Sequence, residues 1–232
     1  VPQDPNDEPA SELLKRIAKE RARLEAEGLY KKYKVTPLVG EDQPFDLPKG
    51  WEGERLDRLF EIQDSLREPI NRAERDARGG EYPYYGASGI VDYVADYIFD
   101  GDTLLISEDG ANLLARSTPI AFSVSGKYWV NNHAHILKFE DMATQRFVEF
   151  YLASIRLDEY ITGAAQPKLN QKALNSIPIP IPVAVAKQAE IVGRIESLQD
   201  ETQRLESIYQ QQLTALDDLK KSLLHQAFSG QL

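Results

Sequence analysis

The feature that most constrains the fold is a proline-rich segment that leads directly into a long helical pattern. Residues 176–182 read Ser-Ile-Pro-Ile-Pro-Ile-Pro, and the helical pattern continues from there to Phe228. Proline has no N–H to donate and a fixed φ, so this segment is expected at a sheet edge or in polyproline geometry. Globular helices rarely exceed about 25 residues without caps. A helix over 186–227 is therefore expected to act as a strut on which a globular domain is mounted.

The long helical pattern carries an apolar seam. Its members alternate at spacings of four and three, which is the heptad pattern of a coiled coil. The expected seam residues are Ile191, Ile195, Leu198, Leu205, Tyr209, Leu216, Leu219 and Leu223, with the polar Thr202 and Gln212 also on the seam. Such a seam calls for a partner helix, and its polar positions help to fix the register. The alternative is a single amphipathic helix that packs against its own domain.

Length and composition favour one globular domain with helical appendages over two separate cores. The chain has 232 residues, of which 42% are hydrophobic, and it contains no cysteine. Disulfides and thiolate chemistry are thereby excluded, and a reducing cytoplasm is compatible with the sequence. No apolar run approaches the roughly 20 residues needed to cross a bilayer, and no signal-peptide pattern opens the chain. We expect a cytoplasmic protein without a membrane partner.

The charge distribution leaves room for a polyanionic partner. A net charge of −10 argues against nucleic acid at first sight. However, no carboxylate occurs between Asp109 and Glu140, or between Glu159 and Glu190, although lysines, arginine and histidines do. Two such windows are consistent with a confined binding site for a polyanion. They could also arise by chance in a sequence of which 28% of the residues are charged.

The pattern along the chain predicts an α/β (α+β) globular domain that carries a long C-terminal coiled-coil helix. Residues 1–50 read as a short helix (12–27) and a linker, 51–182 as the globular domain, and 183–232 as the long helix. Asp-Gly turn dipeptides at 100–101 and 109–110 punctuate the domain. The expected strands are 103–107, 119–124, 128–130, 134–139 and the Ile-Pro run, and the expected helices are 143–161 and 170–175.

Several segments together resemble the specificity subunit of type I restriction–modification systems. They are Glu81–Ile90, Phe99–Ser107, Asn132–His135, Gly163–Asn170, the Ile-Pro run, Ile191–Leu198 and, upstream, Asp4–Leu14 and Pro44–Trp51. Each segment alone is only modestly specific for this family, whereas the order and spacing of all of them are strongly specific for it. The resemblance covers essentially the whole chain.

The resemblance extends to only half of that family's architecture. A complete specificity subunit has two target-recognition domains and two long helices, which pair antiparallel, so this chain resembles the C-terminal half. It is either a fragment or a natural half-length subunit. The resemblance implies duplex DNA as the ligand, and methyltransferase and restriction subunits as partners. With one helix, a homodimer is expected. It would hold two domains about 60 Å apart on an interrupted palindrome, from roughly 42 residues at about 1.5 Å each.

Candidate DNA-binding residues fall in three segments. An aromatic–glycine loop offers tyrosines and close backbone approach, unless it is a β-turn whose tyrosines are half-buried. A later loop combines amides and ammonium groups, which can read base edges, unless it is only a solvated loop before a helix. A third segment, in the first carboxylate-free window, is weaker. The candidates are Tyr84, Tyr85 and Ser88, then Gln166, Lys168, Asn170 and Lys172, and last Arg116, Lys127, Asn131 and His133.

The motifs of catalysis are missing from the sequence. It has no G-x-x-x-x-G-K-[ST] phosphate loop and no glycine-rich cofactor loop paired with an Asn-Pro-Pro-aromatic motif. We therefore expect no catalytic residue and no cofactor, with methylation and cleavage on other polypeptides. His133 and His135 would share one face of a strand, as half a metal site or as a structural or phosphate-contacting pair; the second reading is preferred. The rival function is a coiled-coil adaptor that joins protein subunits without reading DNA.

Overall fold

The computed structural model describes residues 15–16, 18–19, 22–23, 47–48, 51–163, 165–182 and 184–231. The described residues between 15 and 23 are helical, and the rest of the predicted helix 12–27 and most of the predicted linker lie outside the described residues. The chain divides into one unit that ends at Ala189 and another that begins at Glu190. None of the helices in the described part is long and apolar enough to cross a membrane.

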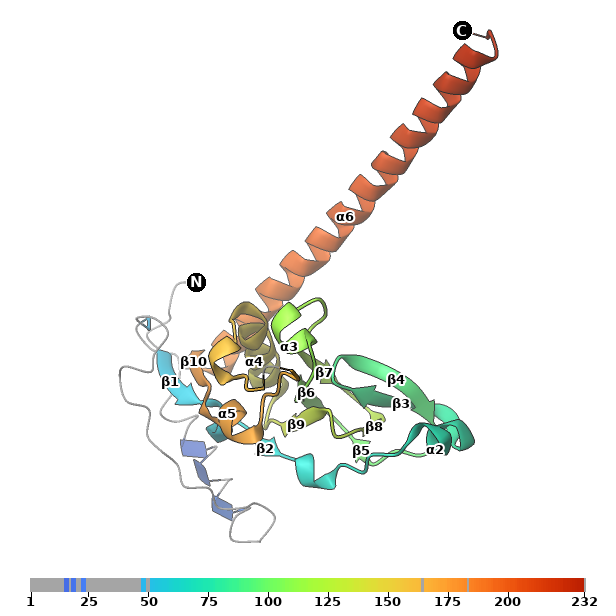
Figure 1. The fold of residues 1–232 in the computed structure, drawn as a ribbon. Helices are drawn as coiled ribbons and strands as arrows, with labels where there is room; N and C mark the ends of the chain where they lie inside the picture. The colour runs from blue at the N-terminus through green and yellow to red at the C-terminus, as the bar shows by residue number, and fades with distance from the viewer. Residues whose placement is uncertain are drawn as a thin grey trace. The chain divides into compact units, whose positions relative to one another are not determined.

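The first unit contains two four-stranded sheets (Figure 1). The first sheet is antiparallel, and its strands in spatial order are β2 (Glu61–Ile62), β9 (Ala134–Lys138), β6 (Thr103–Ser107) and β7 (Ala121–Val124). The strands of the second sheet in spatial order are β4 (Gly89–Val94), β3 (Gly79–Gly86), β8 (Lys127–Val130) and β5 (Phe99–Asp100). In the second sheet β3 and β8 run parallel, so this sheet is mixed.

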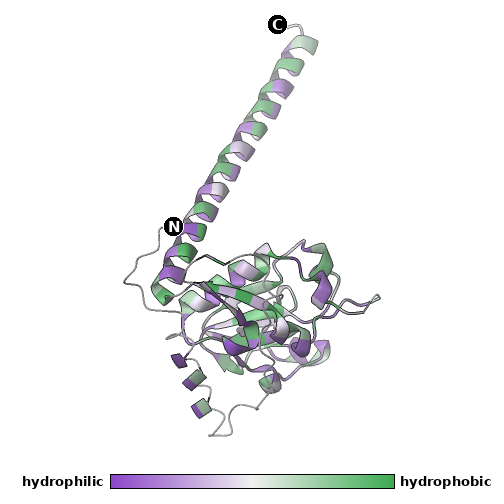
Figure 2. Cartoon of the chain, turned by 90° about the vertical axis from the view of Figure 1, so that its left-hand side faces the viewer, coloured by the Kyte–Doolittle hydropathy of each residue, from purple (hydrophilic) through white to green (hydrophobic). Residues whose placement is uncertain are grey.

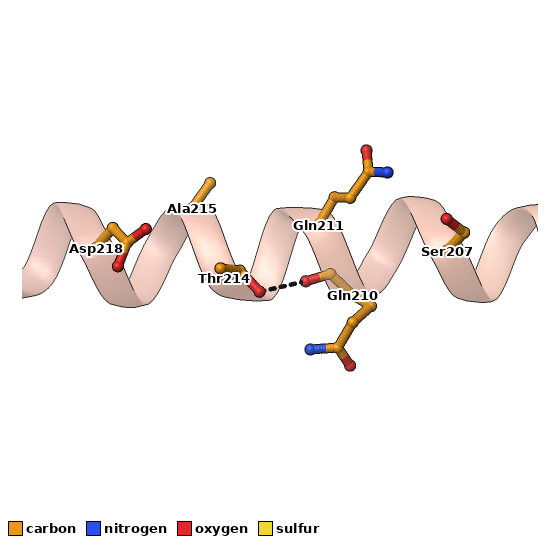
Figure 3. Close-up of a pocket in the computed structure, with 6 residues that line it drawn as sticks. All are labelled: Ser207, Gln210, Gln211, Thr214, Ala215 and Asp218. Carbon is orange, nitrogen blue, oxygen red and sulfur yellow. Dashed lines mark hydrogen bonds between the residues drawn. The ribbon is translucent and has the colours of Figure 1, made fainter.

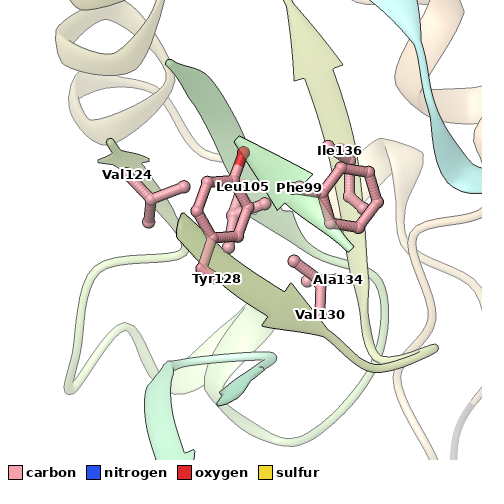
Figure 4. Packing of buried hydrophobic residues seen from close by; sticks show 7 residues of the cluster. All are labelled: Phe99, Leu105, Val124, Tyr128, Val130, Ala134 and Ile136. Carbon is pink, nitrogen blue, oxygen red and sulfur yellow. The ribbon is translucent and has the colours of Figure 1, made fainter. Parts of the chain in front are cut away.

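The main core lies between these two sheets. Figure 4 shows its seven buried side chains, contributed by strands of both sheets: Phe99, Leu105, Val124, Tyr128, Val130, Ala134 and Ile136. The rings of Phe99 and Tyr128 stack with their centroids 5.5 Å apart. The Tyr128 hydroxyl lies 2.7 Å from the hydroxyl of Thr103, which gives this buried polar group a hydrogen-bond partner.

Helix α4 (Met142–Ser154) packs on β6 and β7 of the first sheet. It buries Phe147, Val148 and Leu152. Strand β6 is consequently buried along its whole length, with the inter-sheet core on one face and α4 near the other. The carboxylate of Asp141 caps the helix by accepting from the N–H of Thr144 at 2.8 Å.

The predicted helix 143–161 is too long, because α4 ends at Ser154. The guanidinium of Arg116 donates to the carbonyl oxygens of Leu152 and Ile155, at 3.2 and 3.0 Å, and so satisfies groups that the helix end leaves unpaired. The remaining short helices of the unit are η2 (Leu56–Arg58), η3 (Asp64–Leu66), α2 (Arg72–Ala77), α3 (Asn112–Ala115), η4 (Asp158–Tyr160) and α5 (Gln171–Ser176).

The Ile-Pro run forms strand β10 (Pro178–Pro182), which pairs antiparallel with β1 (Trp51–Arg55) in a sheet of only these two strands. Ile179 and Ile181 are fully buried. A strand with alternating prolines has hydrogen-bond donors on one side only, so pairing on that side is all it can sustain. The expectation of an edge strand is confirmed.

Helix α6 (Val185–Phe228) spans 44 residues, as the heptad pattern predicts. Its first turns belong to the first unit, where the buried Gln188 places its amide oxygen 2.8 Å from the hydroxyl of Thr144. The division between the units at Ala189 therefore falls within α6.

The apolar seam of α6 is open in the single chain. Six of its side chains, from Leu198 to Leu223, are 45–63% exposed. Hydrophobic and hydrophilic residues alternate along the helix in Figure 2. Figure 3 shows a polar face that includes Ser207, Thr214 and Asp218. Ser207 is two residues from the seam residue Tyr209, about 200° around the helix, so the polar face lies opposite the seam.

Candidate nucleic-acid interface

Four segments from both four-stranded sheets meet at one end of the first unit, and we call them the loop cluster. Three follow the ends of β3, β6 and β8, and the fourth precedes α5. They are the turn 86–89, the segment 108–110, the loop 131–133 and the loop 162–170.

Backbone hydrogen bonds join these segments across the two sheets. The N–H of Asn131 donates to the carbonyl of Tyr85 at 3.0 Å, and that of Glu108 donates to the carbonyl of His133 at 2.8 Å. The N–H of Leu169 donates to the carbonyl of Glu108 at 2.8 Å. Residues that are far apart in sequence are thereby fixed side by side.

The loop 162–170 is closed on itself. Thr162 and Lys168 exchange backbone hydrogen bonds of 2.9 and 2.7 Å. Between them, Gly163 has φ +88°, and a Cβ there would lie 2.3 Å from the carbonyl oxygen of Gln166. Only glycine fits this close approach, so Gly163 sets the shape of the loop.

The loop cluster and the start of α5 expose several of the predicted residues: Ser88, His133, Gln166, Lys168 and Lys172. Two further amides are only partly exposed, and their acceptor atoms already serve the backbone. Oδ1 of Asn131 accepts from the N–H of His133 at 2.8 Å, and Oδ1 of Asn170 caps α5 by accepting from the N–H of Ala173 at 3.1 Å.

Acidic groups also reach the loop cluster, so a window free of carboxylates in sequence does not make a region free of them in space. The Lys168 ammonium lies 3.0 Å from Oε1 of Glu108. Nδ1 of His133 lies 3.0 Å from Oδ1 of Asp109. Both acids lie at the start of the first window, and the fold places Glu108 beside Lys168 of the second window and Asp109 beside His133 of the first. The two windows are therefore not free of negative charge in the folded chain.

Glu108 is held ionised by its surroundings. Burial raises its pKa, but hydrogen bonds from Arg67 and Lys168 and the charge of His135 outweigh burial, so the pKa of this carboxyl lies below its ordinary value. Arg67 donates to Oε2 of Glu108 at 2.7 Å and to the carbonyl of Ala134 at 2.8 Å.

The two histidines do not share one strand face, because β9 begins only at Ala134. His133 is exposed beside Asp109, whereas His135 is buried with Nδ1 2.6 Å from Oδ2 of Asp64. Asp64, Glu108 and His135 do bring three potential metal-ligand atoms within 4.8 Å of one another. Arg67 already supplies a positive charge beside both carboxylates of this group. This arrangement fits a structural role for His135.

Of the two tyrosine candidates, Tyr84 is a buried core residue and Tyr85 is partly buried against the core. Tyr84 is 1% exposed, and its hydroxyl accepts from the N–H of Ile70 at 3.2 Å. The ring of Tyr85 packs on Phe122 and Tyr128 with centroids 6.0 and 5.9 Å away. We therefore correct the assignment of Tyr84 to a DNA contact: apolar packing takes up its ring. The β-turn alternative describes this segment better, and of its candidates only Ser88 is exposed.

Arg116 and Lys127 lie away from the loop cluster. Arg116 is engaged at the C-terminal end of α4, and burial lowers the pKa of its guanidinium. Lys127 begins β8, whose other end leads to Asn131, and its ammonium lies 4.5 Å from the ring centroid of Tyr97. At about 3.3 Å per residue, the length of β8 separates Lys127 from the loop cluster by roughly 13 Å.

Asp64, Arg67 and Glu108 were not identified from the sequence, yet they hold the loop cluster together from beneath. Arg67 meets Glu108 across 41 residues, and Asp64 meets His135 across 71. No local spacing encodes such contacts. The nearest signal is the Asp109–Gly110 turn, which marks where β6 ends.

Comparison with known proteins gives one consistent family. Residues 48–215 match the family model described as type I restriction modification DNA specificity domain. The specificity subunit of the Escherichia coli type I restriction enzyme EcoEI is 30% identical over 94% of this chain and 39% of its own length.

Solved structures agree with this at the level of the fold. A chain from a type I restriction–modification system superposes with a TM-score of 0.63 at 18% identity, over 96% of this chain and 54% of that one. The S subunit from M. genitalium superposes with a TM-score of 0.54 at 15% identity, over 70% of this chain and 43% of that one. This chain thus spans about half or less of the proteins it matches. The family match covers most of the chain, which belongs to the type I restriction–modification DNA specificity family.

Proposed function

We propose that this chain recognises a specific sequence in duplex DNA and is a non-catalytic specificity component of a type I restriction–modification complex. It would direct methyltransferase and restriction subunits to the target, in the cytoplasm where that DNA lies. Family membership supports the proposal, as do relatives named as specificity subunits. The observation that carries it is the loop cluster, which exposes amide and ammonium groups on a backbone fixed by hydrogen bonds.

The loop cluster is the DNA-facing surface in this proposal. Gln166 can pair bidentately with adenine, and Lys168 can donate to guanine or neutralise a phosphate. Because Lys168 also contacts Glu108, a phosphate would compete with that carboxylate for the ammonium group. We expect this competition to make binding depend strongly on correct placement of the DNA backbone.

The α6 seam is the assembly surface in this proposal, and a second copy of the chain is its partner. The exposed leucines support pairing with another helix. Two copies related by a twofold axis read identical half-sites in inverted orientation, so the target would be an interrupted palindrome. Selection from a pool of randomised duplexes, with the methyltransferase subunit present, tests this: an asymmetric target would contradict the homodimer.

Salt-dependent binding tests the DNA-facing surface. Lys168→Ala and Lys172→Ala should each weaken duplex binding and reduce the slope of log K against log salt by about 0.9 if one phosphate contact is lost. Lys138→Ala is the matched control, because this exposed lysine ends β9 at the end opposite the loop cluster. Equal slopes for all three variants and the parent would contradict the assignment. A chain whose binding to DNA does not depend on salt would favour the adaptor function.

Sequence preference tests base reading. Gln166→Ala should relax the preference more than the affinity. Asn170→Ala is unsuitable, because it would remove the cap of α5 and cost about 1 kcal/mol of stability. Asn170→Ser keeps a capping oxygen and removes only the amide group. If both variants select the same sequences as the parent, these two side chains do not read bases.

A further inference from the structure

His135 lies directly beneath the loop 162–170. Its side chain is 2% exposed. Nδ1 lies 2.6 Å from Oδ2 of Asp64, and Nε2 lies 2.8 Å from the carbonyl oxygen of Leu169. The ring therefore links the short helix η3 to the loop that carries Lys168.

The partners of the ring determine its hydrogen-bonding role. A backbone carbonyl can only accept, so Nε2 must donate to Leu169. Asp64 accepts at Oδ1 from the N–H of Ile136, 2.9 Å away, and its Oδ2 lies 3.5 Å from the Arg67 guanidinium. Nδ1 of His135 lies against the same Oδ2. The imidazole thus links Asp64 to Leu169 through its two nitrogens, with Glu108 as the other acidic group near the ring.

Leu169 is the point at which the loop is attached to the sheet. Its side chain is fully buried, its N–H donates to Glu108, and its carbonyl accepts from His135. The residue before it, Lys168, and the residue after it, Asn170, are both candidates for contact with DNA. Fixing the Leu169 peptide from both sides fixes the direction in which its neighbours leave the backbone.

We infer that His135 is a positioning residue for recognition: by donating to Leu169 and by its hydrogen bond with Asp64, it fixes the loop 162–170 in the conformation that presents Lys168 and Gln166 to the duplex. The presentation of side chains to the duplex rests on the proposed function, whereas the fixation of the loop 162–170 by His135 does not. A divalent cation among Asp64, Glu108 and His135 would compete with Arg67, which already contacts both carboxylates.

Two amide substitutions separate the two hydrogen bonds of His135. His135→Gln places an amide nitrogen near the position of Nε2 and keeps the donor to Leu169. His135→Asn places it near Nδ1, keeps the hydrogen bond with Asp64 and loses the one to the loop. Both variants are uncharged polar amides, so they differ in which hydrogen bond is kept. We expect backbone amide exchange at Thr162 and Lys168 to be about tenfold faster in His135→Asn than in His135→Gln.

Amide exchange at Leu105 in β6 is the internal reference for global stability. The inference is overturned if the ratio of loop exchange to Leu105 exchange is equal in the two variants. Should both variants fail to fold, the unchanged chain provides the test by NMR. The ring N–H protons of His135 should then exchange slowly with solvent and show coupling through the hydrogen bond to Leu169, with the exposed His133 as reference. Rapid exchange at both histidines would overturn the inference.

Binding to a pool of 30-base-pair duplexes with a randomised centre separates this inference from the proposed function. His135→Asn should lower the salt slope by about one unit, as Lys168→Ala does, and His135→Gln should not. A faster-exchanging loop with an unchanged slope would support the positioning role and contradict the DNA-facing assignment of the loop. Global destabilisation alone reduces the active fraction and leaves the slope of the folded protein unchanged.

Discussion

Replacing two seam leucines of α6 by aspartate, Leu205→Asp together with Leu216→Asp, should abolish self-association. The two side chains are 48% and 62% exposed in the single chain, so about half of each remains to be buried by a partner. Full burial of a leucine is worth about 1.5–3 kcal/mol, and burial of the remaining half therefore about 1 kcal/mol.

A twofold dimer contains four of these leucines. Their loss therefore costs at least about 4 kcal/mol, and because 1.4 kcal/mol corresponds to a factor of ten, Kd rises about a thousandfold. Four carboxylates placed in an apolar seam weaken the dimer further, since each must lose water. A parent dimer with a micromolar Kd would thus become a monomer at any practical concentration.

Sedimentation equilibrium at micromolar concentration measures this effect. The matched control is Ser207→Asp with Thr214→Asp, which adds the same charges on the polar face opposite the seam (Figure 3). Circular dichroism should show equal helix content in both double variants. A parent that sediments as a monomer, with no change on either substitution, would refute the homodimer. Dissociation by the control pair as well would show that charge, and not the seam, governs association.

Three further predictions concern the first unit. Asp141→Ala should lower the free energy of unfolding by about 1 kcal/mol, because the N–H of Thr144 loses its cap, and Asp141→Asn should lose less in the same urea titration. Arg116→Ala should cost about 1–3 kcal/mol by urea unfolding, because the end of α4 loses its charged donor, yet leave the salt slope of duplex binding unchanged. Because the pKa of Glu108 is lowered in the folded protein, its stabilising contribution is present above about pH 4.3 and disappears as pH falls through the folded pKa. Glu108→Gln should therefore flatten the acid branch of stability against pH, and parallel branches in the two proteins would contradict this.

The elements with a strong local signal could be predicted from the sequence. The period of α6, the turn glycines beside β6 and the alternating prolines of β10 each act through neighbouring residues, and all three elements form where they were expected. The end of α4 could not be predicted, because it depends on Arg116, which is 36 residues from Leu152. Hydrophobic periodicity continued past Ser154, whereas the hydrogen bonds that end the helix come from elsewhere in the fold.

The candidate site shows the same division. Gln166 and Lys168 occupy one loop and Lys172 the start of α5, which follows it, so residue type and spacing were enough to group them. Tyr84 was misassigned because an aromatic residue between glycines looks alike whether it faces solvent or the core, and the residues that bury it, Val94 and Trp129, come from other strands. Asp64 and Glu108 lie beneath the loop 162–170 because the strands of the sheet pair. A local sequence pattern does not encode such pairing.

A protein with a negative net charge can bind DNA if its few positive groups are positioned to contact the phosphates of the DNA. In the loop cluster the Lys168 ammonium is held by Glu108, which Arg67 and His135 keep ionised. A phosphate at the right position can replace the carboxylate as partner, whereas a misplaced one gains little and still meets the surrounding negative charge. Weak non-specific attraction of this kind favours discrimination between sequences, because the specificity ratio depends on the difference between the two affinities. Under the proposed function, the net charge of −10 lowers the affinity for every duplex, and the placed contacts of a matching duplex offset this repulsion.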